Sequence, residues 1–226
     1  CPQCLAMDPS PGSCTDRYLN WVNAVARAVK GHYPDNVVLA RAYSDSTRPP
    51  VKVKPEPNVV VMYCPWYWNS RATSAVSWAS PLNITAMKQY MAWTMMVPDQ
   101  MGLYDYPGSW VYGQADRLKF LAKNNARVFY SCGGHGDLFQ WVNAKLLWDP
   151  FLNTEDLVSE FVDAYFGPAA EPMQRYQQLR RQAIDRNLKH ARHPFRDADF
   201  IREARELAQQ AVELADEADD PTRSRI

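Results

Sequence analysis

The sequence has no excess of charge of either sign and no long apolar segment. Lysine and arginine together number 25, and aspartate and glutamate also number 25. Proteins that bind nucleic acid or an anionic membrane normally carry a basic excess, so we expect neither partner. A membrane-spanning helix needs roughly 18 or more consecutive apolar residues, and no run approaches that length. The remaining class is a globular chain that is long enough to bury its own core.

Glycine is also scarce, with 9 residues among 226. The glycine-rich patterns that cradle nucleotides are absent, as are the nucleophile elbow of serine hydrolases and the HExxH helix of zinc proteases. We therefore expect no cofactor. By contrast, the chain has 17 prolines, 12 tyrosines and 8 tryptophans. This composition favours an enzyme with loops lined by aromatic side chains over a flexible linker protein.

The five cysteines do not define a metal site. Cys1 and Cys4 have the spacing of a metal knuckle, but zinc needs a second pair of ligands, and only Cys14 and His32 lie nearby in the sequence. Cys64 and Cys132 stand alone in apolar, strand-like segments. We interpret the cysteines as structural or disulfide-bonded rather than metal-binding, and we predict no metal.

Apolar runs and helical patterns alternate along the first part of the chain. Four runs predict strands, at Val37–Tyr43, Asn58–Cys64, Met101–Asp105 and Arg127–Cys132, and the first of them is apolar enough to be buried on both faces. Helical periodicity marks the segments from Thr15, Ser80 and Tyr112; in the first, the apolar residues are Tyr18, Trp21, Val22, Val25 and Val29. Such alternation predicts an α/β fold with a parallel sheet and helical crossovers.

The chain from residue 137 onward is helical in pattern and ends in two long segments, near 169–191 and 195–218. We therefore divide the chain into a sheet domain over residues 1–150 and a helical extension over 151–226. Four strands cannot close a barrel of eight. Either the sheet is open, or the first half of a barrel precedes Cys1. The chain begins with Cys1 and shows no charged-then-apolar leader, so either a leader was removed or the chain is a piece of a longer protein, and we favour the piece.

The stretch Met101–Trp110 is the strongest candidate for a functional site. Asp105 ends a predicted strand between Tyr104 and Tyr106, and the following Pro107 forces a loop. The carboxyl edge of a parallel sheet is where such folds place their chemistry. Aromatic neighbours that partly desolvate Asp105 would raise the pKa of its carboxyl group towards the range of a general acid. The alternative is a carboxylate that accepts hydrogen bonds from loop amides.

Other aromatic residues and one histidine fall at or just beyond the predicted strand ends. Tyrosines there can donate hydrogen bonds to a sugar, tryptophans can stack on it, and a histidine between glycines is accessible to a ligand. Each tyrosine fits a core position equally well. Asp45, between two serines, fits a turn cap better than a catalytic acid. The predicted substrate-binding residues, besides Tyr104 and Tyr106, are Tyr43, Tyr63, Trp66, Trp68, Trp110 and His135.

Four segments together resemble the bacterial DUF4838 proteins: Cys1–Cys4, Tyr104–Tyr106, Ala144–Pro150 and Phe161–Ala170. The third, Ala-Lys-Leu-Leu-Trp-Asp-Pro, is the most specific, and the resemblance extends to about Arg180. That family is related to glycoside hydrolases of the α-glucuronidase and β-N-acetylglucosaminidase type.

The resemblance implies the C-terminal half of a (β/α)8 barrel followed by a helical extension. It also implies a glycoside hydrolase that acts on a glycan containing uronic acid or N-acetylhexosamine and is secreted or periplasmic. In the family, a catalytic carboxylate would precede Cys1, so part of the active site is missing upstream. A non-catalytic carbohydrate-binding or structural module is the alternative.

Overall fold

The computed structural model describes residues 1–226 except 9–11, 66–75, 108–109, 133–135, 189–196 and 218–224. The chain forms two compact units, Cys1–His135 and Gly136–Ile226. The first holds the sheet and the second is helical. The helix α5, Asp137–Trp148, belongs to the second unit, although the sequence analysis grouped residues up to 150 with the sheet.

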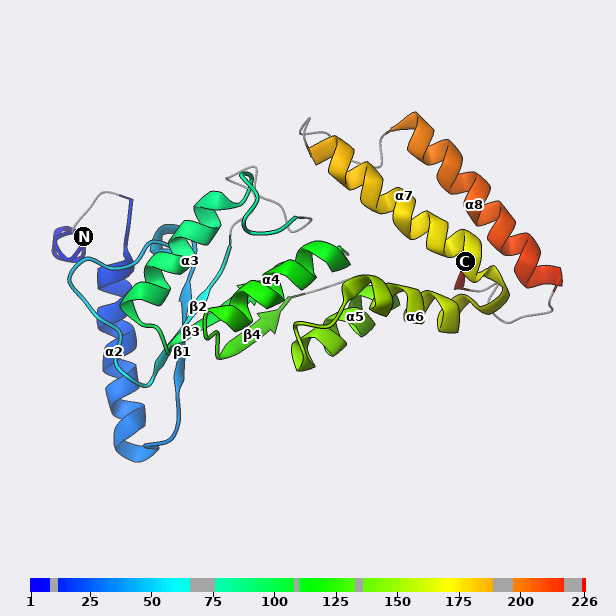
Figure 1. Ribbon diagram of the computed structural model, residues 1–226. Helices are drawn as coiled ribbons and strands as arrows, with labels where there is room; N and C mark the ends of the chain where they lie inside the picture. The colour runs from blue at the N-terminus through cyan, green and yellow to red at the C-terminus, as the bar shows by residue number, and fades with distance from the viewer. Residues whose placement is uncertain (9–11, 66–75, 108–109, 133–135, 189–196, 218–224) are drawn as a thin grey trace. The chain divides into compact units, whose positions relative to one another are not determined.

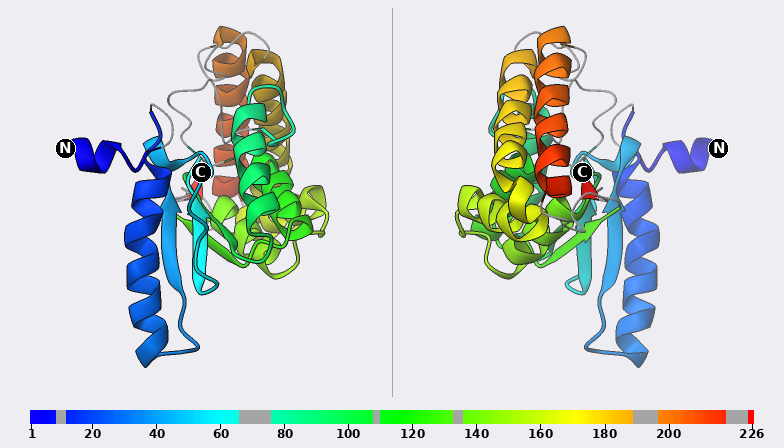
Figure 2. Two further views of the ribbon diagram at one scale, coloured as in Figure 1. Left: turned by 90° about the vertical axis from the view of Figure 1, so that its left-hand side faces the viewer. Right: turned by 90° about the vertical axis from the view of Figure 1, so that its right-hand side faces the viewer.

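The first unit is built on four parallel strands in the order β1-β2-β3-β4. Each strand lies within its predicted range, and the predicted α/β fold with a parallel sheet is confirmed. Figures 1 and 2 show the helices α2, α3 and α4 packed around these strands. The strands are β1 Val38–Ala42, β2 Val59–Tyr63, β3 Met101–Asp105 and β4 Val128–Ser131, and the helices are α2 Thr15–His32, α3 Ile84–Met96 and α4 Val111–Lys123.

The two faces of the sheet have different surroundings. In β1, Ala40 and Ala42 are buried, whereas Leu39 and Arg41 are exposed. The prediction that this strand is buried on both faces was therefore wrong. Side chains alternate across a strand, so the register assigns every strand residue to a face. We call the side of Ala40, Ala42, Val61, Tyr63, Leu103 and Asp105 the helix face, and that of Leu39, Arg41, Met62, Gly102, Tyr104, Val128 and Tyr130 the tyrosine face.

Aromatic rings form the core between the sheet and the helices. Tyr63, Trp78 and Tyr90 contact one another, with ring centres 5.3 to 6.2 Å apart. Trp93 is also buried, and its indole Nε1 donates to the carbonyl of Thr47 at 2.8 Å. This bond fixes α3 to the segment that follows β1.

Helix α2 buries a face that matches the expected one only at Val22. Leu19, Val22 and Ala26 are buried, whereas Trp21 is 65% exposed. Its first turn holds the connection between β1 and β2. The Thr15 hydroxyl donates to the carbonyl of Arg48, and the Asp16 carboxylate accepts backbone hydrogen bonds from residues 51, 52 and 53 at 2.7 to 2.9 Å. The backbone amides of residues 51–53, which lie outside any helix or strand, thereby find hydrogen-bond acceptors.

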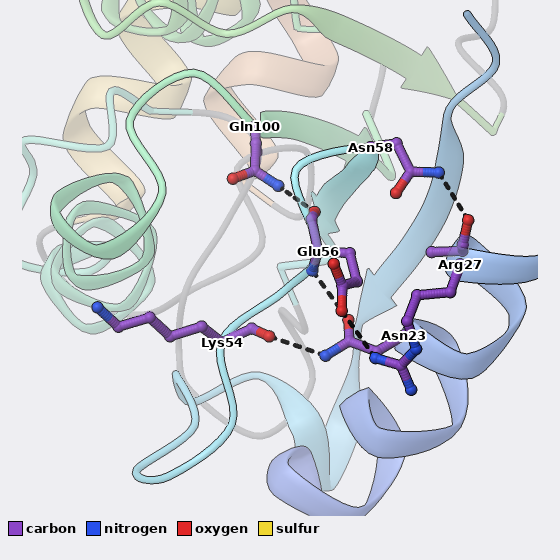
Figure 3. Close-up of polar contacts among 7 residues, drawn as sticks. Asn23, Arg27, Lys54, Glu56, Asn58 and Gln100 are labelled. Carbon is purple, nitrogen blue, oxygen red and sulfur yellow. Dashed lines mark hydrogen bonds and ion pairs between the residues drawn. The ribbon is translucent and has the colours of Figure 1, made fainter. Parts of the chain in front are cut away.

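A second polar network holds the amino ends of the strands (Figure 3). The Asn23 amide donates to the carbonyl of Lys54 and accepts from the amide of Glu56. Asn58 donates to the carbonyl of Ala26, and the Gln100 amide donates to the carbonyls of Glu56 and Val59, both at 2.7 Å. These contacts lie at the edge opposite the expected site, where barrel-type folds place stability rather than chemistry.

Gly102 lies at the closest approach on the tyrosine face. A Cβ atom there would lie 2.6 Å from the Met62 sulfur and 2.7 Å from the carbonyl oxygen of Val128. The sulfur can move aside, but the carbonyl belongs to the neighbouring strand. Only glycine lets β2, β3 and β4 pack at this spacing.

The second unit contains α5, α6 Thr154–Phe166, the short 3-10 turn Gly167–Ala169, α7 Ala170–Leu188 and α8 Ala198–Glu217. The Asn153 side chain caps α6 by accepting from the amide of Glu155. Helices α7 and α8 pack through a buried cluster that includes Leu179, Ala183, Phe200 and Leu207. Within the described residues, no helix combines the length and the apolar character that crossing a bilayer requires.

We expect Asp16→Asn to lower the free energy of unfolding by about 1–3 kcal/mol. The asparagine side chain is neutral and has one acceptor oxygen, so it cannot replace a charged carboxylate that accepts three hydrogen bonds. Burial opposes ionisation of Asp16, but the three amides and Lys52 outweigh it, so the pKa lies below its ordinary value. A lowered folded-state pKa stabilises the protein above the unfolded value and loses that effect as the pH falls. Urea unfolding of both proteins should show the difference narrowing below about pH 4.

The control is Asp35→Asn, an exposed aspartate in the turn after α2. It should leave stability within about 0.5 kcal/mol of the parent at both pH values. If Asp16→Asn and Asp35→Asn behave alike, Asp16 does not hold the connection.

We expect Gly102→Ala to destabilise the sheet unit by about 1–3 kcal/mol, since the new methyl group overlaps the Val128 carbonyl. Gly31→Ala is the matched control, because no atom lies within 4 Å of a Cβ there. Thermal unfolding of both variants measures the difference. Equal melting temperatures of the Gly102→Ala and Gly31→Ala variants would show that the sheet accommodates the methyl group without loss of stability.

Candidate functional site

Three side chains from three strands meet on the tyrosine face near the carboxyl edge. Tyr104 and Tyr130 are partners in the β3 and β4 register, and their rings stack with centres 4.7 Å apart at 25°. The Arg41 guanidinium lies over the Tyr104 ring, with its carbon 4.6 Å from the ring centre. Tyr106 contacts the same ring at 5.2 Å. We call Arg41, Tyr104, Tyr106 and Tyr130 the arginine-tyrosine cluster.

Two phenols of this cluster, Tyr104 and Tyr106, and the nearby Cys64 thiol have raised pKa values and stay protonated at neutral pH. Partial burial raises the pKa of Tyr106 to about 12, with smaller contributions from Cys64, Tyr43, Tyr104 and Cys132. Burial, and then the neighbouring Cys132 thiol, likewise raises the pKa of Tyr104. Burial raises the pKa of the Cys64 thiol to about 12 against a smaller opposing effect of Arg41. The phenols are therefore hydrogen-bond donors, and Cys64 is not an activated nucleophile.

Asp105 lies on the other face of the sheet. Its side chain is fully buried, and its Oδ2 pairs with Arg117 Nε of α4 at 3.2 Å. Its Oδ1 accepts a hydrogen bond from the backbone amide of Tyr106 at 3.0 Å, and Arg117 in turn donates to Gln114. The alternation of the strand thus separates Asp105 from the rings of Tyr104 and Tyr106. The hydrogen bond from the Tyr106 amide is of the kind expected under the alternative interpretation, in which the Asp105 carboxylate accepts hydrogen bonds from loop amides.

Tyr63 also points to the helix face, where its hydroxyl donates to Gln89 at 2.7 Å inside the aromatic core. Burial raises its pKa. Trp110 is half-buried at the residue that precedes α4. The remaining predicted residues Trp66, Trp68 and His135 lie outside the described residues. The structure therefore brings Tyr104 and Tyr106 together and places Tyr63 in the core.

The end of β1 continues into the 3-10 turn Ser44–Ser46. Tyr43, half-buried, precedes this turn, and its backbone amide donates to the Ser46 hydroxyl at 3.1 Å. Ser46 also donates to the carbonyl of Tyr43, so Ser46 rather than Asp45 holds the turn. The Asp45 side chain is exposed. The capping role expected for Asp45 belongs to its neighbour.

The sequence analysis missed Arg41 and Tyr130. The usable signal for Arg41 was a charged side chain in the middle of the apolar run Val37–Tyr43, because a strand buried on both faces would not carry an isolated cation. Tyr130, 52% exposed, occupies the position in β4 that corresponds to Tyr104 in β3. Aligning the two strand ends would have identified it.

All five cysteines are free, so the disulfide alternative does not hold in this structure. Cys1-Pro-Gln-Cys4 forms the start of the short helix α1, Pro2–Leu5, and the Cys1 sulfur accepts from the Cys4 amide at 3.4 Å. Among the residues that the structure describes, no three histidine, cysteine or acidic side chains are grouped so as to hold a metal ion.

Comparison with known proteins places the chain in a family. The model of the DUF4838 family, described as a domain of unknown function, matches residues 1–178. No curated protein and no solved structure matches the chain. The family match covers well over half of the chain and includes all four strands, the whole arginine-tyrosine cluster and helices α5 and α6. The chain therefore belongs to the DUF4838 family.

Proposed function

We propose that this chain forms the sugar-binding wall of a glycoside hydrolase that acts on a glycan containing uronic acid or N-acetylhexosamine. The arginine-tyrosine cluster carries the proposal. Its stacked rings, Tyr104 and Tyr130, lie where parallel strands end, and that edge is the usual place for a ligand in parallel α/β folds. Aromatic faces suit the apolar face of a pyranose, and protonated phenols suit its hydroxyls.

The fold supports the same proposal. Four parallel strands in sequential order, with helices packed around them, are compatible with one half of a (β/α)8 barrel. In such a barrel the tyrosine face would line the interior, and the helix face would meet the outer ring of helices. A secreted or periplasmic location fits a protein that meets polysaccharides outside the cytoplasm.

Hydrolysis of a glycosidic bond normally needs two carboxyl groups, or one together with a substrate acetamido group. Asp105 was the predicted acid, but its contacts are those of a structural ion pair with Arg117. We assign it the role of holding the end of β3 against α4. The family resemblance implies one catalytic carboxylate before Cys1, and we assign no catalytic carboxyl group to the described residues of this chain. Without such groups, the chain is the non-catalytic binding module named as the alternative.

The first test is glycan binding by the full-length protein and by Tyr130→Ala. Loss of the exposed stacking ring should weaken oligosaccharide binding about three- to tenfold, in line with the usual strength of an aromatic contact. Tyr33→Ala is the matched control, because Tyr33 is 63% exposed at the end of α2. Calorimetric titration with uronic acid and N-acetylhexosamine oligosaccharides measures both. No binding of any of them by the parent protein would refute the proposal.

The second test separates the two roles of Asp105. We expect Asp105→Asn to lower the free energy of unfolding by about 3–5 kcal/mol, because it leaves the buried Arg117 without its charged partner. Arg117→Met should cost a similar amount, and the double variant Asp105→Asn with Arg117→Met should recover part of the loss. Unfolding and hydrolysis are measured on the same preparations.

A structural Asp105 predicts that hydrolysis and stability fall together in both single variants. The catalytic prediction requires a different result: Asp105→Asn would abolish hydrolysis while glycan affinity and stability stay unchanged, and Arg117→Met would not reproduce that loss.

A further inference from the structure

Arg41 is poorly explained by the folding of the sheet. Its neighbours Ala40 and Ala42 pack towards the helices, whereas its own side chain is exposed on the tyrosine face. Its backbone amide donates to the Tyr18 hydroxyl at 3.0 Å, which ties the strand to α2 without using the guanidinium. A smaller apolar residue would serve the strand equally well.

Among the described residues, the guanidinium of Arg41 has no counter-charge. Within the described part of the chain, no carboxylate lies within 4.0 Å of it, although Arg27, Arg117 and Arg202 each have one. Its recorded side-chain contact is the Tyr104 ring. Stacking on a ring fixes the plane of a guanidinium while leaving its N–H groups at the rim free to donate.

The surroundings of Arg41 favour an anion. Tyr104 and Tyr106 remain protonated far above neutral pH and can donate alongside the guanidinium. The nearby carboxylate Asp105 is turned to the opposite face, where Arg117 neutralises it. One cation and several neutral donors thus meet on one surface, which is the donor set that recognises carboxylate or sulfate oxygens.

We propose that Arg41 and the tyrosines around it bind an anionic group carried by the sugar, with the ring of that sugar resting on Tyr130. This inference rests on the proposed function. Of the two kinds of sugar named there, it selects the acidic ones over the neutral N-acetylhexosamine. A carboxylate of a uronic acid and a sulfate ester share the chemistry that Arg41 recognises. A planar carboxylate can accept two parallel N–H bonds from the guanidinium.

The test compares three matched oligosaccharides in calorimetric titrations with the full-length protein. One carries a glucuronic acid residue, one is the same molecule with the carboxyl group reduced to an alcohol, and one carries a sulfate ester at that position. We expect the acidic sugar to bind at least tenfold more tightly than the reduced one. If the sulfated oligosaccharide binds more tightly than the one with glucuronic acid, the anionic group that Arg41 recognises is a sulfate ester.

Arg41→Gln should remove the preference, so that acidic and reduced sugars bind within about twofold of each other. Arg127→Gln, an exposed arginine at the amino end of β4, should leave the preference intact. Arg41→Lys keeps the charge but loses the planar fork, and it should retain only part of the preference. It also provides the test if the glutamine variant does not fold.

The possible failures are distinguishable. Equal binding of acidic and reduced sugars by the parent protein would overturn the inference about Arg41 but leave the sugar-binding proposal standing. A preference that survives Arg41→Gln in a folded protein would overturn it as well. Absence of binding to all three oligosaccharides would refute both proposals together.

Discussion

The alternation of side chains across a pleated strand determines what each residue at the carboxyl edge can do. Tyr104, Asp105 and Tyr106 are consecutive, yet the strand sends Asp105 into the helix layer and the two rings to the other side. The register then brings Tyr130 beside Tyr104, and Arg41 reaches the same ring from two strands away. A slip of one residue in β3 would exchange the faces, burying the tyrosines and exposing the carboxylate.

That register depends on contacts at the amino edge and in the middle of the sheet. At the amino edge, side-chain amides from α2 and from Gln100 bind the backbone of the segment that leads into β2. In the middle of the sheet, Gly102 lets β3 approach the backbone of Val128. None of these contacts involves a side chain of the arginine-tyrosine cluster, but they fix the strand positions on which its ring contacts depend.

The sequence was sufficient to predict the elements but not the direction of their side chains. Each of the four strands falls inside its predicted range, because apolar runs bounded by proline, glycine and asparagine are strong local signals. A wholly apolar run such as β2, which is buried throughout, shows no alternation and so does not indicate which residues face which side of the sheet. The pattern could therefore not tell which face Asp105 would take.

The same limit applies to the helices. Apolar spacing located α2, but Trp21 is exposed while Leu19 and Ala26 are buried, because the position of β1 and not hydrophobicity alone selects the buried side. Arg41 was missed for a related reason: the run Val37–Tyr43 was predicted to be buried on both faces, and that prediction gives no position to a charged side chain. Because Arg41 is exposed, its position indicates which residues of β1 face away from the helices.

Asp105 and the arginine-tyrosine cluster are linked through the main chain although they lie on opposite faces. The carboxylate binds the amide of Tyr106 with one oxygen and Arg117 of α4 with the other. The first contact orients the residue that follows the strand, and the second anchors it to a helix. The ring of Tyr106, and the Tyr104 ring that it contacts, are thereby held at the edge of the sheet. A buried charged pair adds little net stability compared with an apolar pair of similar size, so its conformational specificity is the better reason for its presence here. Asp105 would then serve the proposed sugar site by positioning two tyrosines.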